Sequence, residues 1–144
     1  LHKNNPSLFE RILAPIARKL VTKFAALPVD IVAGDFSLRC QFTDNYSEKK
    51  FVFTPWRYDY PERYEMTRNL PDDGVFVDIG ANVGLYTLTA ARVLGTQGTI
   101  LAFEPNPLTL KRLTTNLDAN RDKFKTWPTI KVLNVGVAEV GHNR

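Results

Sequence analysis

Four residues near the middle of the chain have the types and the spacing that a nucleotide site needs. They form the pattern D-x-G-x-N-x-G, which consists of Asp78, Gly80, Asn82 and Gly84. Glycine lets the backbone approach a ligand closely, and free N–H groups at the start of a helix attract an anion. Further along the chain stands Glu104, and an acid at the tip of a second strand can accept both hydroxyls of a ribose. Together these residues predict a site for a nucleoside with an anionic tail.

Two short apolar runs must position these residues. The run 75–77 is β-branched and aromatic and has no polar interruption, which is typical of a strand buried on both faces of a parallel sheet. A helical pattern follows over 85–94, and a second strand pattern over 99–103 ends just before Glu104. The order of strand, glycine-bearing turn, helix and strand predicts a βαβ unit with the polar residues at one edge of its sheet.

The glycine spacing separates two kinds of nucleotide site. A dinucleotide fingerprint has the form G-x-G-x-x-G, in which backbone touches a pyrophosphate. Counted from Gly80, this form requires glycine at positions 82 and 85, where the chain has Asn82 and Leu85. A nicotinamide-dependent oxidoreductase of the Rossmann type therefore stays only an alternative.

The run FVDIGANVGLYT at 76–87, followed by AFEPNP at 102–107, resembles the FkbM-type family of class I S-adenosylmethionine-dependent methyltransferases. The resemblance extends over 72–141, about the second half of the chain. It implies a Rossmann-like α/β fold with three αβα layers and a parallel central sheet. It also implies S-adenosyl-L-methionine as the cofactor, and it says little about the methyl acceptor.

The resemblance implies a role for each residue of the two motifs. Asp78 would organise the methionine end of the cofactor through its amino group, and Glu104 would bind the ribose. Asn82 replaces the middle glycine of the generic class I motif and tolerates a left-handed backbone; we expect its side chain to cap N–H groups of the next helix. Asn106 and 137–139 would line the adenine, and Glu65 would meet the sulfonium or amino end. The other expected cofactor contacts are Gly80, Ala81, Gly84, Tyr86, Pro105, Val137 and Ala138.

The implied chemistry is methyl transfer from a sulfonium, for which a protein mainly positions the partners and excludes water. Transfer to oxygen needs a deprotonated acceptor, often produced by a general base. Only Glu65 and Asp59 are candidates, so we assign no catalytic residue. We expect a small-molecule acceptor that carries a hydroxyl, such as a sugar, a polyketide-like compound or another metabolite. A non-catalytic binding module with the same fold is a further alternative.

Composition is that of an ordinary globular protein and limits the other functional classes. The 144 residues are 44% hydrophobic and 24% charged, which suits one domain at most. The net charge of +4 is small and spread over the chain, so it does not favour a nucleic-acid partner. Cys40 is the single cysteine, and His2 and His142 stand at the two ends, so no metal site is predicted. We expect a cytoplasmic protein.

The chain begins with Leu1 and stops at Arg144, shortly after a third strand pattern over 130–137. By resemblance a class I sheet has seven strands, of which three can be placed here. We therefore interpret the chain as the N-terminal part of a longer methyltransferase, with a complete small domain as the alternative. The expected division has two parts. The segment 1–70 holds an N-terminal helix, a β meander and an aromatic and acidic cover segment, and 71–144 is the N-terminal half of the cofactor-binding domain.

The segment 1–70 predicts a helix followed by a small antiparallel sheet. An amphipathic pattern over 7–27 predicts a helix that packs on the domain, with contact to a membrane surface as the alternative. Its uncharged run is too short to span a bilayer. Apolar and polar residues alternate within 29–53, which predicts a meander whose last strand is 51–53.

An aromatic and acidic stretch, 56–65, precedes the first motif. One interpretation is a flap over the cofactor or substrate. The other, which we favour, is a short helix that covers the sheet edge, with Tyr60 and Tyr64 in the core and the charges in solvent.

Overall fold

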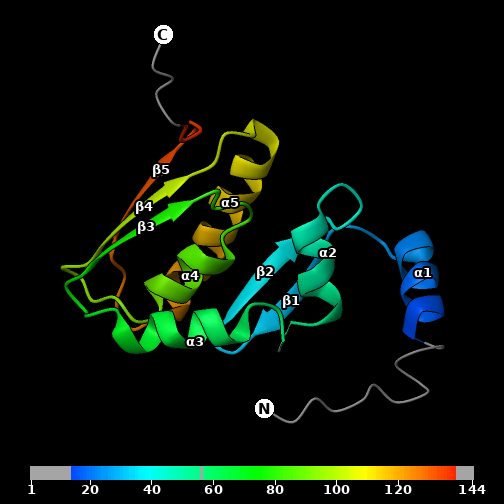
Figure 1. The fold of residues 1–144 in the computed structure, drawn as a ribbon, viewed down its shortest axis with the longest axis horizontal. Helices are drawn as coiled ribbons and strands as arrows, with labels where there is room; N and C mark the ends of the chain where they lie inside the picture. The colour runs from blue at the N-terminus through cyan, green and yellow to red at the C-terminus, as the bar shows by residue number, and fades with distance from the viewer. Residues whose placement is uncertain (1–13, 56, 139–144) are drawn as a thin grey trace, which may run out of the picture.

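The structure is a computed structural model that describes residues 14–55 and 57–138 (Figure 1). The predicted helical stretch 7–13, Trp56 and the predicted adenine-lining Glu139 lie outside the described residues. The elements in chain order are α1 (Ala14–Phe24), β1 (Val29–Ala33), β2 (Phe36–Cys40), α2 (Tyr46–Phe53), α3 (Tyr60–Asn69), β3 (Val75–Ile79), α4 (Leu85–Ala91), β4 (Thr99–Phe103), α5 (Pro107–Asn120), the 3-10 turn η2 (Arg121–Lys123) and β5 (Thr129–Leu133).

The main sheet has the order β3-β4-β5, and both strand pairs are parallel. Val75 pairs with Thr99, and Thr99 pairs with Thr129, so the strands start level and end level. The predicted βαβ unit is therefore confirmed. The third strand ends at Leu133, earlier than the predicted 137.

One face of this sheet carries the core. Ile100 and Ala102 of β4 are fully buried. Ala102 packs in the cluster that contains Leu88 of α4 and Leu113 of α5, and Ile100 packs in a second cluster with Ala91 of α4. Burying a leucine side chain stabilises a fold by about 1.5–3 kcal/mol. Helices α4 and α5 thus cover the same face of the sheet (Figure 1).

The opposite face is open, contrary to the prediction of a strand buried on both faces. Val75 and Ile79 of β3 are 64% and 62% exposed, and Val77 is half-exposed. Their side chains alternate with Phe76 and Asp78, which point to the helix side. An uninterrupted apolar run shows that a strand can be buried on both faces of its sheet, but the packing of other elements decides whether both faces are covered. Among the described residues, no helix covers this face.

Strands β1 and β2 form an antiparallel hairpin with Val29 opposite Cys40. Two buried amides of α5 hold the free edge of β2. The Asn116 side chain accepts from the Arg39 N–H at 2.8 Å and donates to the Arg39 carbonyl at 3.3 Å. Asn120 makes the same pair with the backbone of Ser37, at 2.9 and 2.7 Å. Because these amides replace a neighbouring strand, the hairpin is joined to the α/β unit through α5.

The predicted third strand of the meander, 51–53, is wrong, because these residues belong to helix α2. The Asn45 side chain caps this helix by accepting from the Glu48 N–H at 3.1 Å. Asparagine followed three residues later by glutamate is a helix start signal, and here it outweighs the β propensity of the aromatic and β-branched residues. Phe51 is buried on the hairpin side.

Helix α3 confirms the predicted short helix in the aromatic and acidic stretch. The tyrosines are not in the core as predicted: Tyr60 is 54% exposed and Tyr64 is 46% exposed. Their rings stack on each other, with centroids 6.0 Å apart. They are neighbours at helical spacing on a face that solvent reaches.

Helix α1 is also less buried than predicted. Ile16, Leu20 and Phe24 of its apolar stripe are exposed; a contact to the domain is made by Arg18, whose guanidinium lies 5.8 Å from the ring centre of Phe53. In the part of the chain that the structure describes, no helix is both long enough and apolar enough to cross a membrane.

Candidate functional site

The two sequence motifs meet at the carboxyl ends of β3 and β4. Ile79 pairs with Phe103 in the parallel register, so the residues that follow each strand emerge side by side. The N–H groups of Gly80 and Ala81 both donate to the Phe103 carbonyl at 2.9 Å. The glycine-bearing turn therefore rests on the end of β4.

Glu104 is the first residue after β4 and is only 7% exposed. Its Oε2 accepts from the Asn82 N–H at 2.9 Å, and its Oε1 accepts from the Asn106 N–H at 2.9 Å. A carboxylate has about four lone-pair sites, so each oxygen retains acceptor capacity. The backbone therefore holds this acid in one orientation without using up its hydrogen-bonding capacity.

Three residues of the turn adopt the left-handed region that favours glycine. Gly80 has a φ of +76°, and a Cβ placed there would have no heavy atom within 4 Å. Asn82 has a φ of +49°, as its predicted tolerance required. Gly84 has a φ of +99°, and a Cβ there would lie 2.8 Å from Leu113 Cδ1. The space above Gly80 is thus open to a ligand, whereas a Cβ at position 84 would displace the end of the Leu113 side chain.

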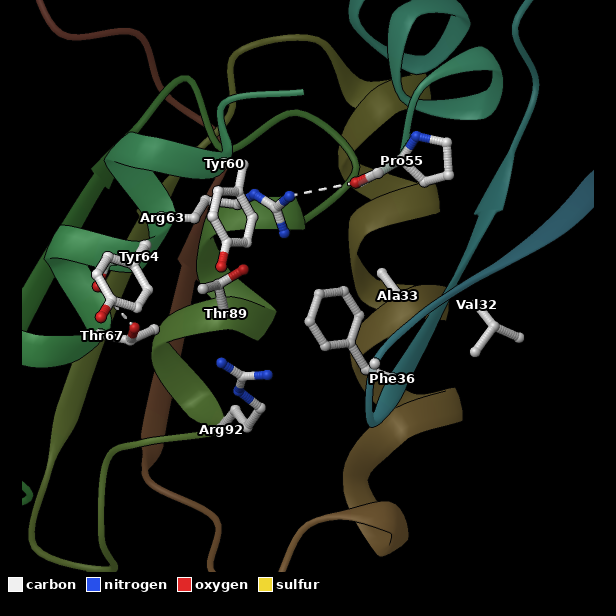
Figure 2. Close-up of a pocket in the computed structure, with 11 residues that line it drawn as sticks. Val32, Ala33, Phe36, Pro55, Tyr60, Arg63, Tyr64, Thr67, Thr89 and Arg92 are labelled. Carbon is white, nitrogen blue, oxygen red and sulfur yellow. Dashed lines mark hydrogen bonds between the residues drawn. The ribbon is translucent and has the colours of Figure 1, made fainter. Parts of the chain in front are cut away.

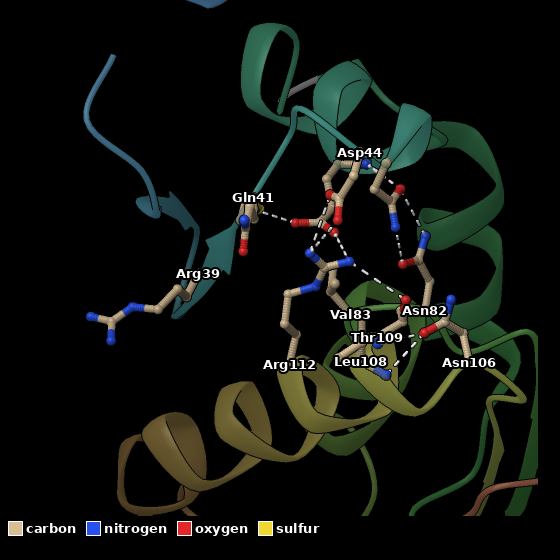
Figure 3. Close-up of polar contacts among 12 residues, drawn as sticks. Arg39, Gln41, Asp44, Asn82, Val83, Asn106, Leu108, Thr109 and Arg112 are labelled. Atoms are coloured by element: carbon tan, nitrogen blue, oxygen red, sulfur yellow. Dashed lines mark hydrogen bonds and ion pairs between the residues drawn. The ribbon is translucent and has the colours of Figure 1, made fainter.

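The predicted capping role of the Asn82 side chain is wrong. The residue before α4 is Gly84, and the Asn82 amide instead pairs with the amide of Asn45 at the start of α2 (Figure 3). Asn45 Nδ2 donates to Asn82 Oδ1 at 2.7 Å, and Asn82 Nδ2 donates to Asn45 Oδ1 at 3.4 Å. Asn82 is therefore held from two sides. Its backbone N–H is bound by Glu104, and its side-chain amide is bound by Asn45 at the start of α2.

Asp78 points to α4 from the next-to-last position of β3 and is buried. Its Oδ2 accepts from Thr87 Oγ1 at 2.5 Å. Burial raises the pKa of this carboxyl, the hydrogen bonds from Thr87 oppose the rise, and the charge of Glu104 adds to it. Sequence reasoning missed Thr87, although it stands at the end of the first motif run; this contact fastens the first turn of α4 to β3.

A buried ion pair next to the turn was also missed. The Glu48 side chain is completely buried, and its Oε1 lies 3.1 Å from Arg112 Nη2, without the geometry of a hydrogen bond. Its Oε2 accepts from the Gln41 N–H, and Arg112 also lies 3.2 Å from Asp44 (Figure 3). Burial raises the pKa of Glu48, against the opposing effects of Gln41 and Arg112. The Asn45–Glu48 capping pattern could have indicated the helix, but not its partner on α5.

Glu48 and the turn line a small cavity of about 110 Å³, together with Tyr58 and Tyr86. Tyr86 lies on α4 and is half-buried, and burial, followed by the charge of Asp59, raises the pKa of its hydroxyl to about 12. Asp59, a candidate base, is therefore close to this cavity, although it does not line it.

Comparisons with known proteins find sequence relatives that are named methyltransferases. No family model matches the chain. The chain is 46% identical over 48 residues, 33% of its length, to "Methyltransferase 1" of Beauveria bassiana (strain ARSEF 2860). It is 41% identical over 71 residues, 49% of its length, to "Methyltransferase sdnD" of Sordaria araneosa. These matches cover 19% and 24% of the two proteins, so the chain spans about a fifth to a quarter of the relatives it matches.

A solved structure extends the comparison to most of the chain. The M. jannaschii tRNA m1G37 methyltransferase matches with a TM-score of 0.54 and 17% identity, over 77% of this chain and 31% of that protein. The chain has the fold of Rossmann-like methyltransferases. At this identity the likeness concerns the fold alone.

Within this methyltransferase fold, the other predicted site residues lie in different places. Asn106 is exposed, and its Oδ1 caps α5 by accepting from the N–H groups of Leu108 and Thr109, at 2.9 and 3.2 Å. Its backbone is joined to Glu104, but its amide oxygen is already used. The remaining predicted residues are exposed: Pro105 after β4, Val137 and Ala138 after β5, and Glu65 on α3, which bonds to Asn69 and does not line the small cavity.

Proposed function

We propose that the chain carries the cofactor-binding part of an S-adenosylmethionine-dependent methyltransferase of FkbM type that transfers a methyl group to a hydroxyl oxygen. The observation that carries the proposal is the Glu104 carboxylate, held by the Asn82 and Asn106 N–H groups beside the open Gly80 turn. The sequence likeness to two proteins named methyltransferases supports it.

The residues present fit the nucleoside part of this cofactor. Glu104 retains acceptor capacity for the two ribose hydroxyls, and the open space at Gly80 lets a ligand approach the backbone. Asn106, Pro105, Val137 and Ala138 would line the adenine, the last two from the segment after β5.

For the methionine end we propose contacts from Asp78 and the turn residues, including Ala81, Gly84 and Tyr86, and a further contact from Glu65. Oδ2 of Asp78 is engaged by Thr87, so an ammonium group would meet the other carboxylate oxygen or a bridging water. When bound, the cofactor supplies a methyl group activated by a sulfonium. The tasks of the chain are then orientation and exclusion of water.

The methyl acceptor in this proposal is a small molecule with a hydroxyl group, such as a sugar, a polyketide-like compound or another metabolite, in the cytoplasm. A base would have to lie near the acceptor oxygen. Asp59 is a better candidate than Glu65, because it lies beside Tyr86, which lines the small cavity, whereas Glu65 is exposed on α3.

The test is calorimetric titration of the protein with S-adenosylhomocysteine. Because hydrogen bonds to a charged group contribute about 1.5–3 kcal/mol, Glu104→Ala should weaken binding by about 10- to 100-fold. Asp118→Ala removes an exposed carboxylate of α5 and should leave the affinity unchanged. Melting temperatures show whether the variants fold, and Glu104→Gln retains one oxygen for the backbone N–H groups.

Equal affinity of the Glu104→Ala variant and the unmodified protein would refute the proposed ribose contact. NADH serves as the competing ligand. Tight NADH binding that S-adenosylhomocysteine does not displace would favour the oxidoreductase alternative.

A further inference from the structure

A second cavity lies away from the methyltransferase motifs, between the β1–β2 hairpin, α3 and α4 (Figure 2). Its volume is about 430 Å³, within the range of about 300–1,000 Å³ that small-molecule sites occupy. None of the residues that line it belongs to the turn or to the two sequence motifs. The stacked tyrosines of α3, which the proposed function leaves without a role, form one of its walls.

Two guanidinium groups face this cavity, and none of its lining residues is a carboxylate. Arg92 directly follows α4, and its side chain is 36% exposed. Its ion pair with Asp35 in the hairpin turn is a long contact of 3.9 Å. Arg92 therefore keeps most of its donors for another partner, since a guanidinium has five N–H groups.

Arg63 of α3 is less exposed than Arg92. Its Nε and Nη2 donate to the carbonyl of Tyr58 at 3.2 and 3.0 Å, and Nη2 also donates to the carbonyl of Pro55 at 3.3 Å. Among the described residues, no hydrogen bond is recorded for its Nη1. Burial lowers the pKa of Arg63, Tyr86 and Asp59 oppose this, and the charge of Arg92 lowers it further. Two like charges thus share one cavity, and a bound anion would relieve their repulsion.

The rest of the wall is aromatic and apolar. Figure 2 shows Tyr60 and Tyr64 on one side of the cavity and Phe36 on the other, with the arginine head groups between them. The two tyrosine rings are nearly parallel, at 20°. Aromatic walls favour a planar ring through stacking and edge contacts, and a guanidinium fork matches a carboxylate with two parallel hydrogen bonds.

We propose that this cavity binds a small molecule with an aromatic body and a carboxylate group, the ring between the tyrosines and Phe36 and the carboxylate on Arg92. This inference goes beyond the proposed methyl transfer, because it uses none of the residues assigned to the cofactor. The proposed site lies near the end of α4 that is farther from the glycine-bearing turn. Tyr86 at the start of α4 lines the small cavity, whereas Thr89 and Arg92, towards and just after the end of α4, line the larger cavity.

The experiment is calorimetric titration of the protein with 2-naphthoate, with the neutral 2-naphthalenemethanol as the matched probe. The carboxylate should bind at least about tenfold more tightly than the alcohol, because charge-assisted hydrogen bonds are roughly twice as strong as neutral ones. Arg92→Gln should remove this preference, and Arg92→Lys should restore part of it. The control is Arg121→Gln, which replaces an exposed arginine at the end of α5. It should leave the affinities of both probes unchanged.

Tyr64→Ala should weaken both probes alike, since it removes the ring and no charge. Equal binding of the two probes, or a carboxylate preference that survives Arg92→Gln in a folded variant, would overturn the inference. Glu104→Ala should leave naphthoate binding unchanged, and Arg92→Gln should leave S-adenosylhomocysteine binding unchanged. A failure of this site is therefore distinguishable from a failure of the proposed function.

Discussion

Replacement of Asn82 tests the geometry of the turn most directly. Asn82 has a φ of +49° and makes two amide contacts with Asn45. In Asn82→Val, an L-residue with a branched side chain must adopt the left-handed region, which costs about 1–2 kcal/mol, and the amide pair, worth about 1 kcal/mol, is lost. The expected destabilisation is about 2–3 kcal/mol. Asn82→Gly loses the same pair but relieves the backbone, so we expect about 1 kcal/mol or less.

Thermal unfolding followed by circular dichroism separates the two variants. For a domain of this size, 1 kcal/mol shifts the melting temperature by about 3 °C, so valine should lower it by about 6–9 °C and glycine by no more than about 3 °C. Binding of S-adenosylhomocysteine should stay within about tenfold for glycine, because only one hydrogen-bonded pair is lost. It should fall much further for valine.

Asn45→Ser is the matched control for the amide pair. Serine is an equally good helix cap, so α2 should persist while the contact to Asn82 is removed. The destabilisation of the double variant Asn45→Ser, Asn82→Gly should be about 1 kcal/mol smaller than the sum of the two single effects, since both changes delete the same pair. If the valine variant melts together with the glycine variant, Asn82 does not have a positive φ and the assignment of the turn is wrong.

Two further predictions concern buried groups that titrate. The pKa of Asp78 is raised above its ordinary 3.8, so the folded protein holds this proton more tightly than the unfolded chain. The contribution of the carboxyl to stability is complete below pH 3.8 and is lost as the pH rises through the folded-state pKa. Asp78→Asn should flatten this loss in urea unfolding at several pH values, and an unchanged profile would contradict it. Burial raises the pKa of Cys40 from 9.0 to about 12, so at pH 8 the native thiol should react with iodoacetamide about a thousandfold more slowly than in the unfolded chain. Equal rates would show that this thiol is accessible.

Local patterns in the sequence were sufficient for the centre of the fold. The apolar run of β3, the glycines after it and the run of β4 predicted the strand, turn, helix and strand that the structure has. The parallel connection then brought Glu104 beside Gly80, because the carboxyl ends of neighbouring parallel strands lie at one edge. Each of these signals lies within a few consecutive residues.

The supports of the site come from residues far apart in the sequence. Asn45 and Asn82 are 37 positions apart, and Arg39 and Asn116 are 77 apart. The pattern of residues within one segment cannot predict such a pair. Asn45 or Asn82, taken alone, is equally suited to a turn or to a helix cap. Only the docking of α2 and the hairpin on α5 brings these partners into contact.

Burial shows the same division between local pattern and tertiary structure. The sequence alone determined that 75–77 is an apolar strand and that the tyrosines of 56–65 belong to a short helix. Only the tertiary structure decided that Val75 and Ile79 face solvent and that Tyr60 and Tyr64 line a cavity. The physical reason is that hydrophobicity and periodicity specify which face of an element can be buried, whereas coverage depends on where the other elements pack.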